Sequence, residues 1–448
     1  MNRIDVDRAS PTDRAFLAMG TGDGGPVQFG VLLLLGRAAG LDLVRVRQLI
    51  GERVPAVPRL RRRLVPAPRG GGGPIWVDDP GFDVRRHVRP AVCAPPGDGQ
   101  AVLDTALSLV SAPLPRDAPP WSATFLTGLA GGEAALVVVL DHVLADGVGG
   151  LAVLARLVDG GAETAAVPYP RPWPGAVALR REALAGRLRS VRRIGPAARA
   201  LFASTAAAGG LHPPRATPRS LLGPAGSRHR LVVVRAELAP LRAAAHRHEA
   251  SVNDAVLVAV AGALHRLLRA RHEDVRTFAI GVPVSGRAAA DASHLGNAVS
   301  PLLVTVPGTG DVAGRLALVA ARVRASKAAA TGPPPIAVLG ALFRPLAALG
   351  LYRWYLDHQR RMHTLVSHVR GPAGPVTFGG VPIGEAIPLS AGAGGNLTVL
   401  FEVLSYAGNV VISVLADAAR CPDLGVLADG LAAELDLVCR ESREQRPK

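Results

Sequence analysis

Short apolar runs with strand character alternate with segments of helical periodicity in both halves of the chain. In the first half, strand-like runs cover 28–35, 121–129 and 134–140, and helical segments cover 41–54, 102–110 and 148–158. In the second half, strand-like runs cover 231–237, 278–284, 300–306, 397–404 and 409–415, and helical segments cover 253–269 and 423–438. This alternation predicts the α/β (α+β) class, in which helices cover the faces of mixed β-sheets.

Residues 159–228 interrupt the alternation with prolines, small residues and many arginines. Because 448 residues are more than one hydrophobic core normally organises, we predict two domains. The boundaries are an N-terminal domain at 1–158, a crossover linker at 159–228 and a C-terminal domain at 229–448. The arginine-rich part of the linker is interpreted as a solvated helix, with contact to a membrane surface as the alternative.

The charge balance is basic, with 51 Lys and Arg against 35 Asp and Glu, which gives a net charge of +16. Such a surface favours phosphate-bearing ligands, anionic membranes or nucleic acid. No basic run is interleaved with aromatic residues, so we expect no nucleic-acid partner. The charged first 20 residues and the lack of a charge-free apolar stretch of about 18 residues predict neither a signal peptide nor a membrane span. We therefore expect a cytoplasmic protein.

The sequence lacks the signatures of several other enzyme classes. Cys93, Cys421 and Cys439 have no metal-ligand spacing, and no histidine lies in an H-E-x-x-H motif, so no metal site is expected. No serine lies in G-x-S-x-G, which argues against a nucleophile-elbow hydrolase. The G-x-G-x-x-G match at 20–25 is followed by Pro26 and a strand instead of a helix, so it is a turn and not a nucleotide site. We expect no bound cofactor.

One polar cluster follows a buried strand. The apolar run at 134–140 ends at Asp141-His142, and Asp146-Gly147 follow after three residues. Strand packing would hold the backbone of His142 rigidly, and an imidazole that titrates near neutral pH suits a general base. From the residues alone, a surface turn with a structural histidine is the alternative.

Asp141-His142-x-x-x-Asp146-Gly147 resembles the HHxxxDG signature of the chloramphenicol acetyltransferase-like superfamily. Within that superfamily the chain is most similar to the bacterial wax ester synthase/diacylglycerol acyltransferase family, and further blocks match in order along nearly the whole chain. They are ASPTDRAFL (9–17), VPRLRRRLV (57–65), FDVRRHV (82–88), the active-site stretch at 112–150, SVNDAVLVAVAGALHRLL (251–268), PVSGR (283–287), GNAVSPLLV (296–304), SHVRGP (367–372) and NLTVLFEVLSYAGNVVI (396–412).

The resemblance implies two chloramphenicol acetyltransferase-like domains that meet at a solvent channel with the motif histidine at its middle. It implies acyl-CoA as the acyl donor and diacylglycerol or a long-chain alcohol as the acceptor, and hence triacylglycerol or wax ester synthesis. It also implies peripheral association with the inner face of the membrane or with lipid bodies. It leaves the oligomeric state open.

The resemblance also implies roles for single residues. His142 matches the second motif histidine, the general base that takes the proton of the acceptor hydroxyl. Asp146 and Gly147 are expected to support the loop that carries this base, and we hypothesise Arg287 as the ion-pair partner of Asp146. Candidates for the channel or the domain interface are Trp121, Asn253, Asp254 and Asn297, although packing beneath the motif strand is the other interpretation of Trp121, and a helix cap that of Asn253-Asp254.

Asp141 departs from the family pattern, because a histidine usually stands there. If the carboxylate faces the ring of His142, it raises the pKa of the imidazole and weakens the base at neutral pH. If it points away, it replaces a structural hydrogen bond. His368 in SHVRGP likewise stands where the family usually has asparagine.

Two other functions compete with acyl transfer from CoA to a lipid alcohol. One is a related transferase that takes its acyl group from a carrier protein, or from CoA, and acylates a polyketide or glycolipid alcohol. The other is a non-catalytic protein that binds lipid or CoA. The retained His142, Asp146 and Gly147 argue against the non-catalytic alternative.

Overall fold

The computed structural model describes residues 6–20, 25–37, 40–161, 168–191, 216, 220–224, 226, 228–285, 297, 299–329, 349–392 and 395–441. Its helices are α1 (Pro11–Met19), α2 (Leu43–Arg53), α3 (Val84–His87), α4 (Gly99–Ser111), α5 (Gly147–Leu157), α6 (Ala176–Val191), α8 (Leu238–Arg247), α9 (Val252–Ala270), α10 (Val312–Ala329), α12 (Leu351–Asp357) and α13 (Leu424–Glu441), with short turns η1 (Val54–Ala56) and η2 (Pro58–Arg61). Its strands are β1 (Gln28–Leu35), β2 (Arg62–Val65), β3 (Ile75–Asp78), β4 (Val88–Val92), β5 (Trp121–Thr127), β6 (Ala134–Asp141), β7 (His229–Glu237), β8 (Thr277–Ser285), β9 (Val299–Pro307), β10 (Thr364–Arg370), β11 (Thr377–Phe378), β12 (Val381–Ser390), β13 (Val399–Tyr406) and β14 (Asn409–Asp417).

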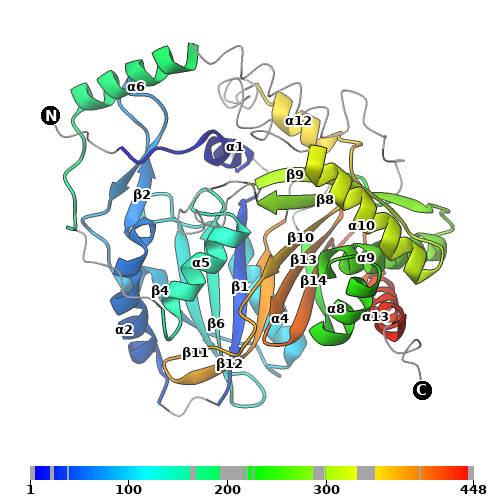
Figure 1. Ribbon diagram of the computed structural model, residues 1–448. Coiled ribbons are helices and arrows are strands. Elements are labelled where there is room, and N and C mark those ends of the chain that lie inside the picture. Colours follow the sequence, from blue (N-terminus) through cyan, green and yellow to red (C-terminus); the bar gives the residue numbers. More distant parts are fainter. Residues whose placement is uncertain are drawn as a thin grey trace.

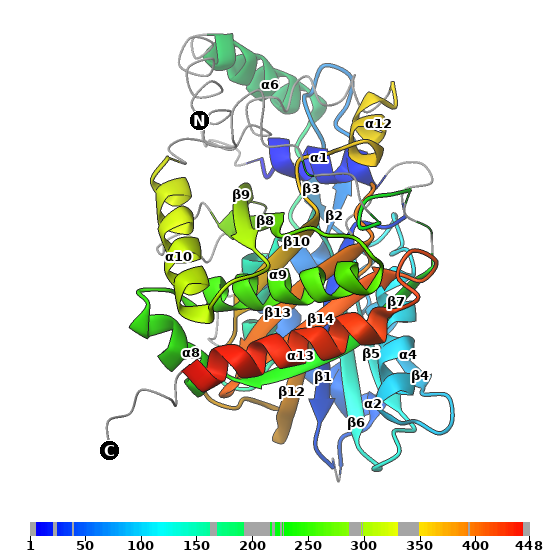
Figure 2. The same ribbon diagram turned by 90° about the vertical axis from the view of Figure 1, so that its right-hand side faces the viewer.

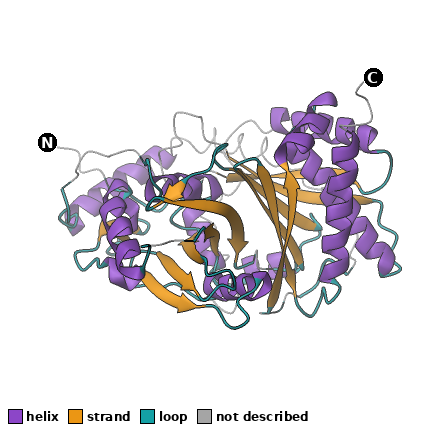
Figure 3. Ribbon diagram, turned by 90° about the horizontal axis from the view of Figure 1, so that it is seen from below, coloured by secondary structure: helices purple, strands orange, loops and turns teal. Residues whose placement is uncertain are grey.

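Two mixed six-stranded sheets organise the molecule, which confirms the predicted class. The first has the order β11-β12-β1-β6-β5-β4, and the second has the order β7-β14-β13-β10-β8-β9. The pairs β4–β5, β10–β13 and β10–β8 are parallel, and the other neighbours are antiparallel. Viewed from below, the strands form two groups with helices on both flanks (Figure 3).

The helices of the second half cover the outer face of their sheet. Figure 2 shows α9 and α13 running across β13 and β14, with α8 and α10 beside them. Helix α9 carries apolar residues around most of its circumference, and from Val252 to Leu268 nearly all of them are buried. An apolar helix of this kind belongs in the core of a large domain.

Helix α4 lies where the two sheets meet. Its apolar face (Val102, Leu103, Ala106, Leu107 and Val110) shares one buried cluster with residues of both sheets, among them Leu32 and Val137 of the first and Leu231 and Leu415 of the second. The apolar spacing that predicted a helix at 102–110 therefore buries this stripe between the two halves.

The chain returns to the first sheet late in the sequence. Strand β12 pairs antiparallel with β1, from Phe29 opposite Ser390 to Leu35 opposite Ile383. Phe378 of β11 and Ile383 of β12 belong to the buried cluster of the first sheet. Residues 377–390 therefore complete the N-terminal sheet, although the predicted boundaries assigned them to the C-terminal domain at 229–448. Two features therefore join the halves: strand β12, which comes late in the chain but lies in the first sheet, and helix α4, which packs between the sheets.

Part of the predicted linker at 159–228 forms a helix. Helix α6 packs Leu179 against Ile75 and Val77 of β3, while much of its remaining surface is exposed. Figures 1 and 2 show α6 at the same end of the molecule as α1 and α12. In the described part of the chain, no single helix is long and apolar enough to cross a membrane. Helices α8 and α9 reach that length and apolar composition only when they are taken together, and the two are bent by 96° relative to each other.

Candidate active site

His142 follows the last residue of β6 and is fixed by its own backbone. Its N–H donates to the carbonyl of Val27 at 3.1 Å, and its carbonyl accepts a hydrogen bond from the side-chain amide of Asn297. The same amide nitrogen lies 2.8 Å from Oδ1 of Asp13, a buried residue of α1. The histidine is therefore held between β1, α1 and the segment that leads into β9.

Asp146 ends the loop and starts α5. Its Oδ1 accepts a hydrogen bond of 2.8 Å from the N–H of Gly149, so it is the N-cap of the helix, and the residue is almost completely buried. A capping carboxylate satisfies free backbone donors and interacts favourably with the helix dipole. Gly147 comes next, and a Cβ atom there would lie 2.9 Å from Cγ2 of Val369 on β10. The glycine therefore permits a close approach of the loop to the second sheet.

The imidazole of His142 lies between two aromatic rings. The ring of Phe16 stacks on it with centroids 4.8 Å apart and planes 9° apart, and the ring of Phe29 lies 4.6 Å away at 39°. Burial lowers the pKa of His142 to about 4, against an opposing effect of Asp146. Nδ1 is buried and has no hydrogen-bond partner within the described ranges. At neutral pH the ring is therefore uncharged and able to accept a proton.

Asp141 bonds to the loop backbone. Its Oδ1 accepts a hydrogen bond of 2.8 Å from the N–H of Val143, and burial raises its pKa to about 6. The charge that acts on the pKa of His142 is Asp146. This geometry favours the second of the two alternatives, in which the carboxylate replaces a structural hydrogen bond and leaves the base neutral.

A cavity of about 580 Å³ opens beside His142. Its walls come from α1, β1, β6 and α5 on one side and from β8, β10, β13 and α12 on the other, so it lies between the two halves of the molecule. Figure 1 shows where these helices and strands lie. Most of the lining is apolar. His142, Asp146, Tyr355, Arg361 and Glu402 are the titratable groups among the described lining residues. An apolar cavity with few polar groups suits a hydrocarbon chain whose reactive end is placed at the base.

The other predicted site residues do not line this cavity within the described ranges. Trp121 is buried on β5, directly opposite Leu140 of the motif strand β6, and its Nε1 donates to the carbonyl of Leu60 at 2.8 Å. Ser251 is the N-cap of α9, and Asp254, the third residue of the helix, forms a capping box with it, so the helix-cap interpretation holds for Asp254. Asn253 is partly exposed beside it. Arg287, the predicted partner of Asp146, lies outside the described residues, and no metal-binding cluster occurs among those that are described.

The structure adds residues to the site that the sequence patterns did not indicate. Phe16 and Asp13 lie in the block ASPTDRAFL, whose Ser10–Asp13 spacing is a capping-box signature, but nothing local points from α1 to His142. Glu402 was visible as one carboxylate in the apolar run VLFEVLSY. Leu400, Glu402 and Leu404 are every second residue of this run, so their side chains lie on the same face of a strand.

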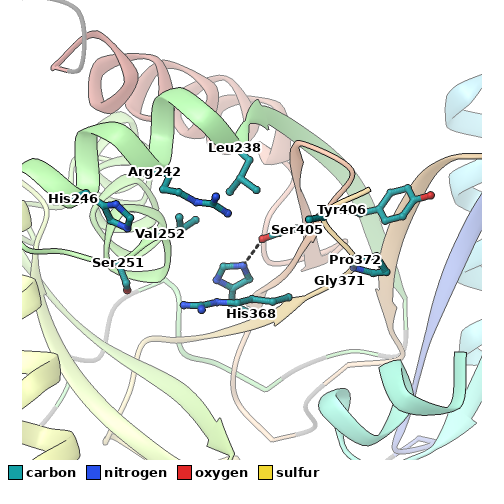
Figure 4. A pocket seen from close by; sticks show the side chains of 12 residues that line it. Leu238, Arg242, His246, Ser251, Val252, His368, Gly371, Pro372, Ser405 and Tyr406 are labelled. Atoms are coloured by element: carbon teal, nitrogen blue, oxygen red, sulfur yellow. Dashed lines mark hydrogen bonds between the residues drawn. The ribbon is translucent and has the colours of Figure 1, made fainter. Parts of the chain in front are cut away.

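A second cavity, of about 360 Å³, lies on the opposite face of β10 (Figure 4). Residues 365, 367 and 369 line the first cavity, whereas His368 and Arg370 line the second, together with Arg242 and His246 of α8. Nε2 of His368 lies 2.8 Å from the Ser405 hydroxyl, and burial, with Arg370 adding to it, lowers the pKa of this histidine to about 4. No motif residue lines it, so the first cavity is the candidate active site.

Comparisons with known proteins match most of the chain. The model of the wax ester synthase/diacylglycerol acyltransferase catalytic domain matches residues 9–256, and the model of the C-terminal domain of the same family matches residues 295–438. A putative diacylglycerol O-acyltransferase of Mycobacterium tuberculosis is 30% identical in an alignment of 432 positions that covers 90% of each chain. A probable diacylglycerol O-acyltransferase of the same organism, tgs1, is 29% identical in an alignment of 401 positions that covers 85% of each chain.

Solved structures agree on the fold. The wax ester synthase/diacylglycerol acyltransferase of Marinobacter aquaeolei VT8 superposes with a TM-score of 0.67 at 20% identity, covering 98% of this chain and 100% of that one. The first condensation domain of the calcium-dependent antibiotic synthetase gives a TM-score of 0.65 at 18% identity, covering 100% and 98%. With both family models and a relative matched over nine-tenths of its length, the chain belongs to the wax ester synthase/diacylglycerol acyltransferase family.

Proposed function

We propose that the chain transfers a fatty acyl group from acyl-CoA to the hydroxyl of diacylglycerol or a long-chain alcohol, with His142 as the general base. The observation that carries the proposal is the position of the imidazole. It lines a largely apolar cavity between the two sheets, and burial keeps it uncharged at neutral pH. The family and the acyltransferase names of its relatives supply the reaction type.

The reaction exchanges a thioester for an oxygen ester. The acceptor oxygen attacks the thioester carbonyl while the imidazole of His142 takes the hydroxyl proton. When the tetrahedral intermediate collapses, the C–S bond breaks and the CoA sulfur leaves with its electron pair. The imidazolium then returns the proton to that thiolate, so no acyl-enzyme is needed. Asp146 caps α5 and, together with Asn297, holds the loop that positions the ring.

The test compares the wild type with His142→Ala on palmitoyl-CoA and either hexadecanol or dipalmitoylglycerol, with free thiol release as the measurement. General-base assistance typically contributes roughly 10² to 10⁴ in rate, so kcat should fall by about that factor. Equal thermal unfolding of both proteins would show that the fold is intact. Undiminished acyl transfer by His142→Ala would exclude the proposed role.

We also propose that the end of the molecule formed by α1, α6 and α12 docks on a lipid surface. Leu349, Leu351 and Trp354 expose 72%, 49% and 61% of their surface at α12, and the adjoining Tyr355 lines the cavity. Exposed apolar side chains next to a lipid cavity suit insertion at a membrane interface. Helix α6 is at the same end and adds arginines that anionic headgroups attract (Figure 1).

Co-sedimentation with phosphatidylglycerol-containing vesicles tests this docking. Trp354→Glu removes a large apolar side chain from the interface and adds an unfavourable charge, so vesicle binding should weaken by about 10-fold or more. Val426→Glu on α13 is the matched control, because Val426 is also exposed and helix α13 lies away from the end formed by α1, α6 and α12 (Figure 2). Equal vesicle binding of the two variants would rule out docking through α12.

A further inference from the structure

One wall of the active-site cavity is built from three cross-strand pairs of side chains. Strands β10 and β13 run parallel, and alternate residues of a strand point to the same face. Three pairs on this face line the cavity: Leu365 with Leu400, Ser367 with Glu402, and Val369 with Leu404. The two flanking pairs are apolar, whereas the middle pair carries a hydroxyl and a carboxyl group.

The middle pair lies close to the catalytic loop. Val369 belongs to the neighbouring pair, and its Cγ2 would be 2.9 Å from a Cβ atom at Gly147, which follows Asp146. Two residues along a strand span about 7 Å. Ser367 and Glu402 are therefore one row of side chains away from the contact between β10 and the motif loop, within reach of a substrate chain bound at His142.

Glu402 places a carboxyl group in a largely apolar cavity wall, where a structural role does not require one. Burial raises its pKa to about 7, and a hydrogen bond with Ser367 offsets only part of that effect. The other carboxylate among the described lining residues, Asp146, is used as a helix cap. A carboxyl group in apolar surroundings destabilises the fold unless it is fully hydrogen-bonded, and such groups cluster at functional sites. Near neutral pH the acid form is well populated, and that form both donates and accepts hydrogen bonds.

We propose that Glu402 and Ser367 form a hydroxyl-recognition subsite. The cavity takes a substrate whose hydrocarbon part carries a hydroxyl group in addition to the one that reacts. A hydroxyl both donates and accepts, which matches a carboxyl beside a serine. The inference rests on the proposed acyl transfer. Two kinds of substrate carry such a second hydroxyl: an acceptor such as a monoacylglycerol, and an acyl-CoA whose acyl chain is hydroxylated.

The experiment measures kcat/KM by thiol release for two matched substrate pairs. The first compares monopalmitoylglycerol with hexadecanol as acceptor, and the second compares hydroxypalmitoyl-CoA with palmitoyl-CoA as donor. In Glu402→Leu, the ratio for the hydroxylated partner should fall by about 10-fold, the change in binding that corresponds to the loss of a hydrogen bond worth about 1.4 kcal/mol. Val426→Met on α13, an exposed position that does not line the cavity, is the control and should leave both ratios within about twofold.

The two arms separate the sources of the hydroxyl. A loss confined to the acceptor pair assigns the subsite to the acceptor, and a loss confined to the donor pair assigns it to the acyl chain. Glu402→Leu with both ratios unchanged would overturn the proposal. Folding is not at risk, since removal of a buried carboxyl should raise the unfolding temperature.

Failure of the proposed function has a different signature, because then no substrate pair releases thiol in the wild type. In that case the shift of the unfolding temperature by bound monopalmitoylglycerol or hydroxypalmitate replaces turnover as the readout. A shift that is present in the wild type and reduced in Glu402→Leu supports the subsite, and equal shifts in both proteins refute it.

Discussion

Gly150 offers a way to disturb the base without touching it. In Gly150→Ala the new Cβ would lie 2.5 Å from Cε2 and 2.8 Å from Cζ of Phe29. That is about 1 Å closer than the ~3.5 Å at which two carbon atoms reach their optimal separation. The ring of Phe29 must move, and it is the ring that lies 4.6 Å from the imidazole of His142. A displacement of about 1 Å in a reacting group can reduce the rate roughly 10²-fold, which is the expected fall in kcat/KM.

The stability change of Gly150→Ala should be small by comparison. Alanine is favoured over glycine inside a helix by about 1 kcal/mol, whereas overpacking costs about 1–3 kcal/mol, so the net loss should not exceed about 2 kcal/mol. Urea unfolding measures this loss, and thiol release measures activity. Gly425→Ala in α13 is the control, because a Cβ there meets nothing within 4 Å. Full activity in Gly150→Ala, or an equal loss in Gly425→Ala, would refute the reasoning.

Three further substitutions test the surroundings of the base. Asn297→Ala removes the amide that bonds both Asp13 and the motif loop; we expect a loss of about 1–3 kcal/mol in unfolding free energy and reduced kcat, and unchanged kcat would contradict the bridging role. Asp141→Asn keeps an acceptor for the N–H of Val143 but removes a carboxylate whose pKa burial raises to about 6. Because a raised carboxyl pKa destabilises the fold above that pH, this variant should gain up to ~3 kcal/mol at pH 8 and less at pH 5, with activity retained; equal gains at both pH values would contradict this account. Trp121→Phe should lose about 1 kcal/mol by urea unfolding with unchanged KM, whereas a changed KM would place Trp121 in the substrate channel.

Local patterns predicted those parts of the fold that depend on local physics. The apolar run at 28–35 became β1 with the same bounds, and the run at 134–140 became β6 with one residue added. The apolar spacing at 148–158 predicted the helix after the motif, which the structure has as α5 (Gly147–Leu157) with Asp146 as its N-cap. These features follow from side-chain periodicity and capping, which a single segment records.

Contacts between segments that are far apart in the sequence could not be predicted from local patterns. The pairing of β12 with β1 depends on which of several apolar strands meet, and all of them carry similar residues. The contact of Asn297 with Asp13 links positions 284 residues apart, and neither residue alone points to the other. Glu402 was visible as an unexpected carboxylate, but only the arrangement of β10 and β13 places it on the cavity wall.

The proposed mechanism needs His142 to be a neutral base, which its buried surroundings keep uncharged. The most direct measurement is the pH dependence of kcat/KM for palmitoyl-CoA with hexadecanol, between pH 5 and 8. Neutral imidazole is the active form, so activity is lost as the pH falls through the pKa of the base. With that pKa at about 4, roughly nine-tenths of the neutral form remains at pH 5, and activity there should be close to its value at pH 7. A fall to a few per cent at pH 5, as for a solvated histidine with a pKa near 6.5, would contradict the account.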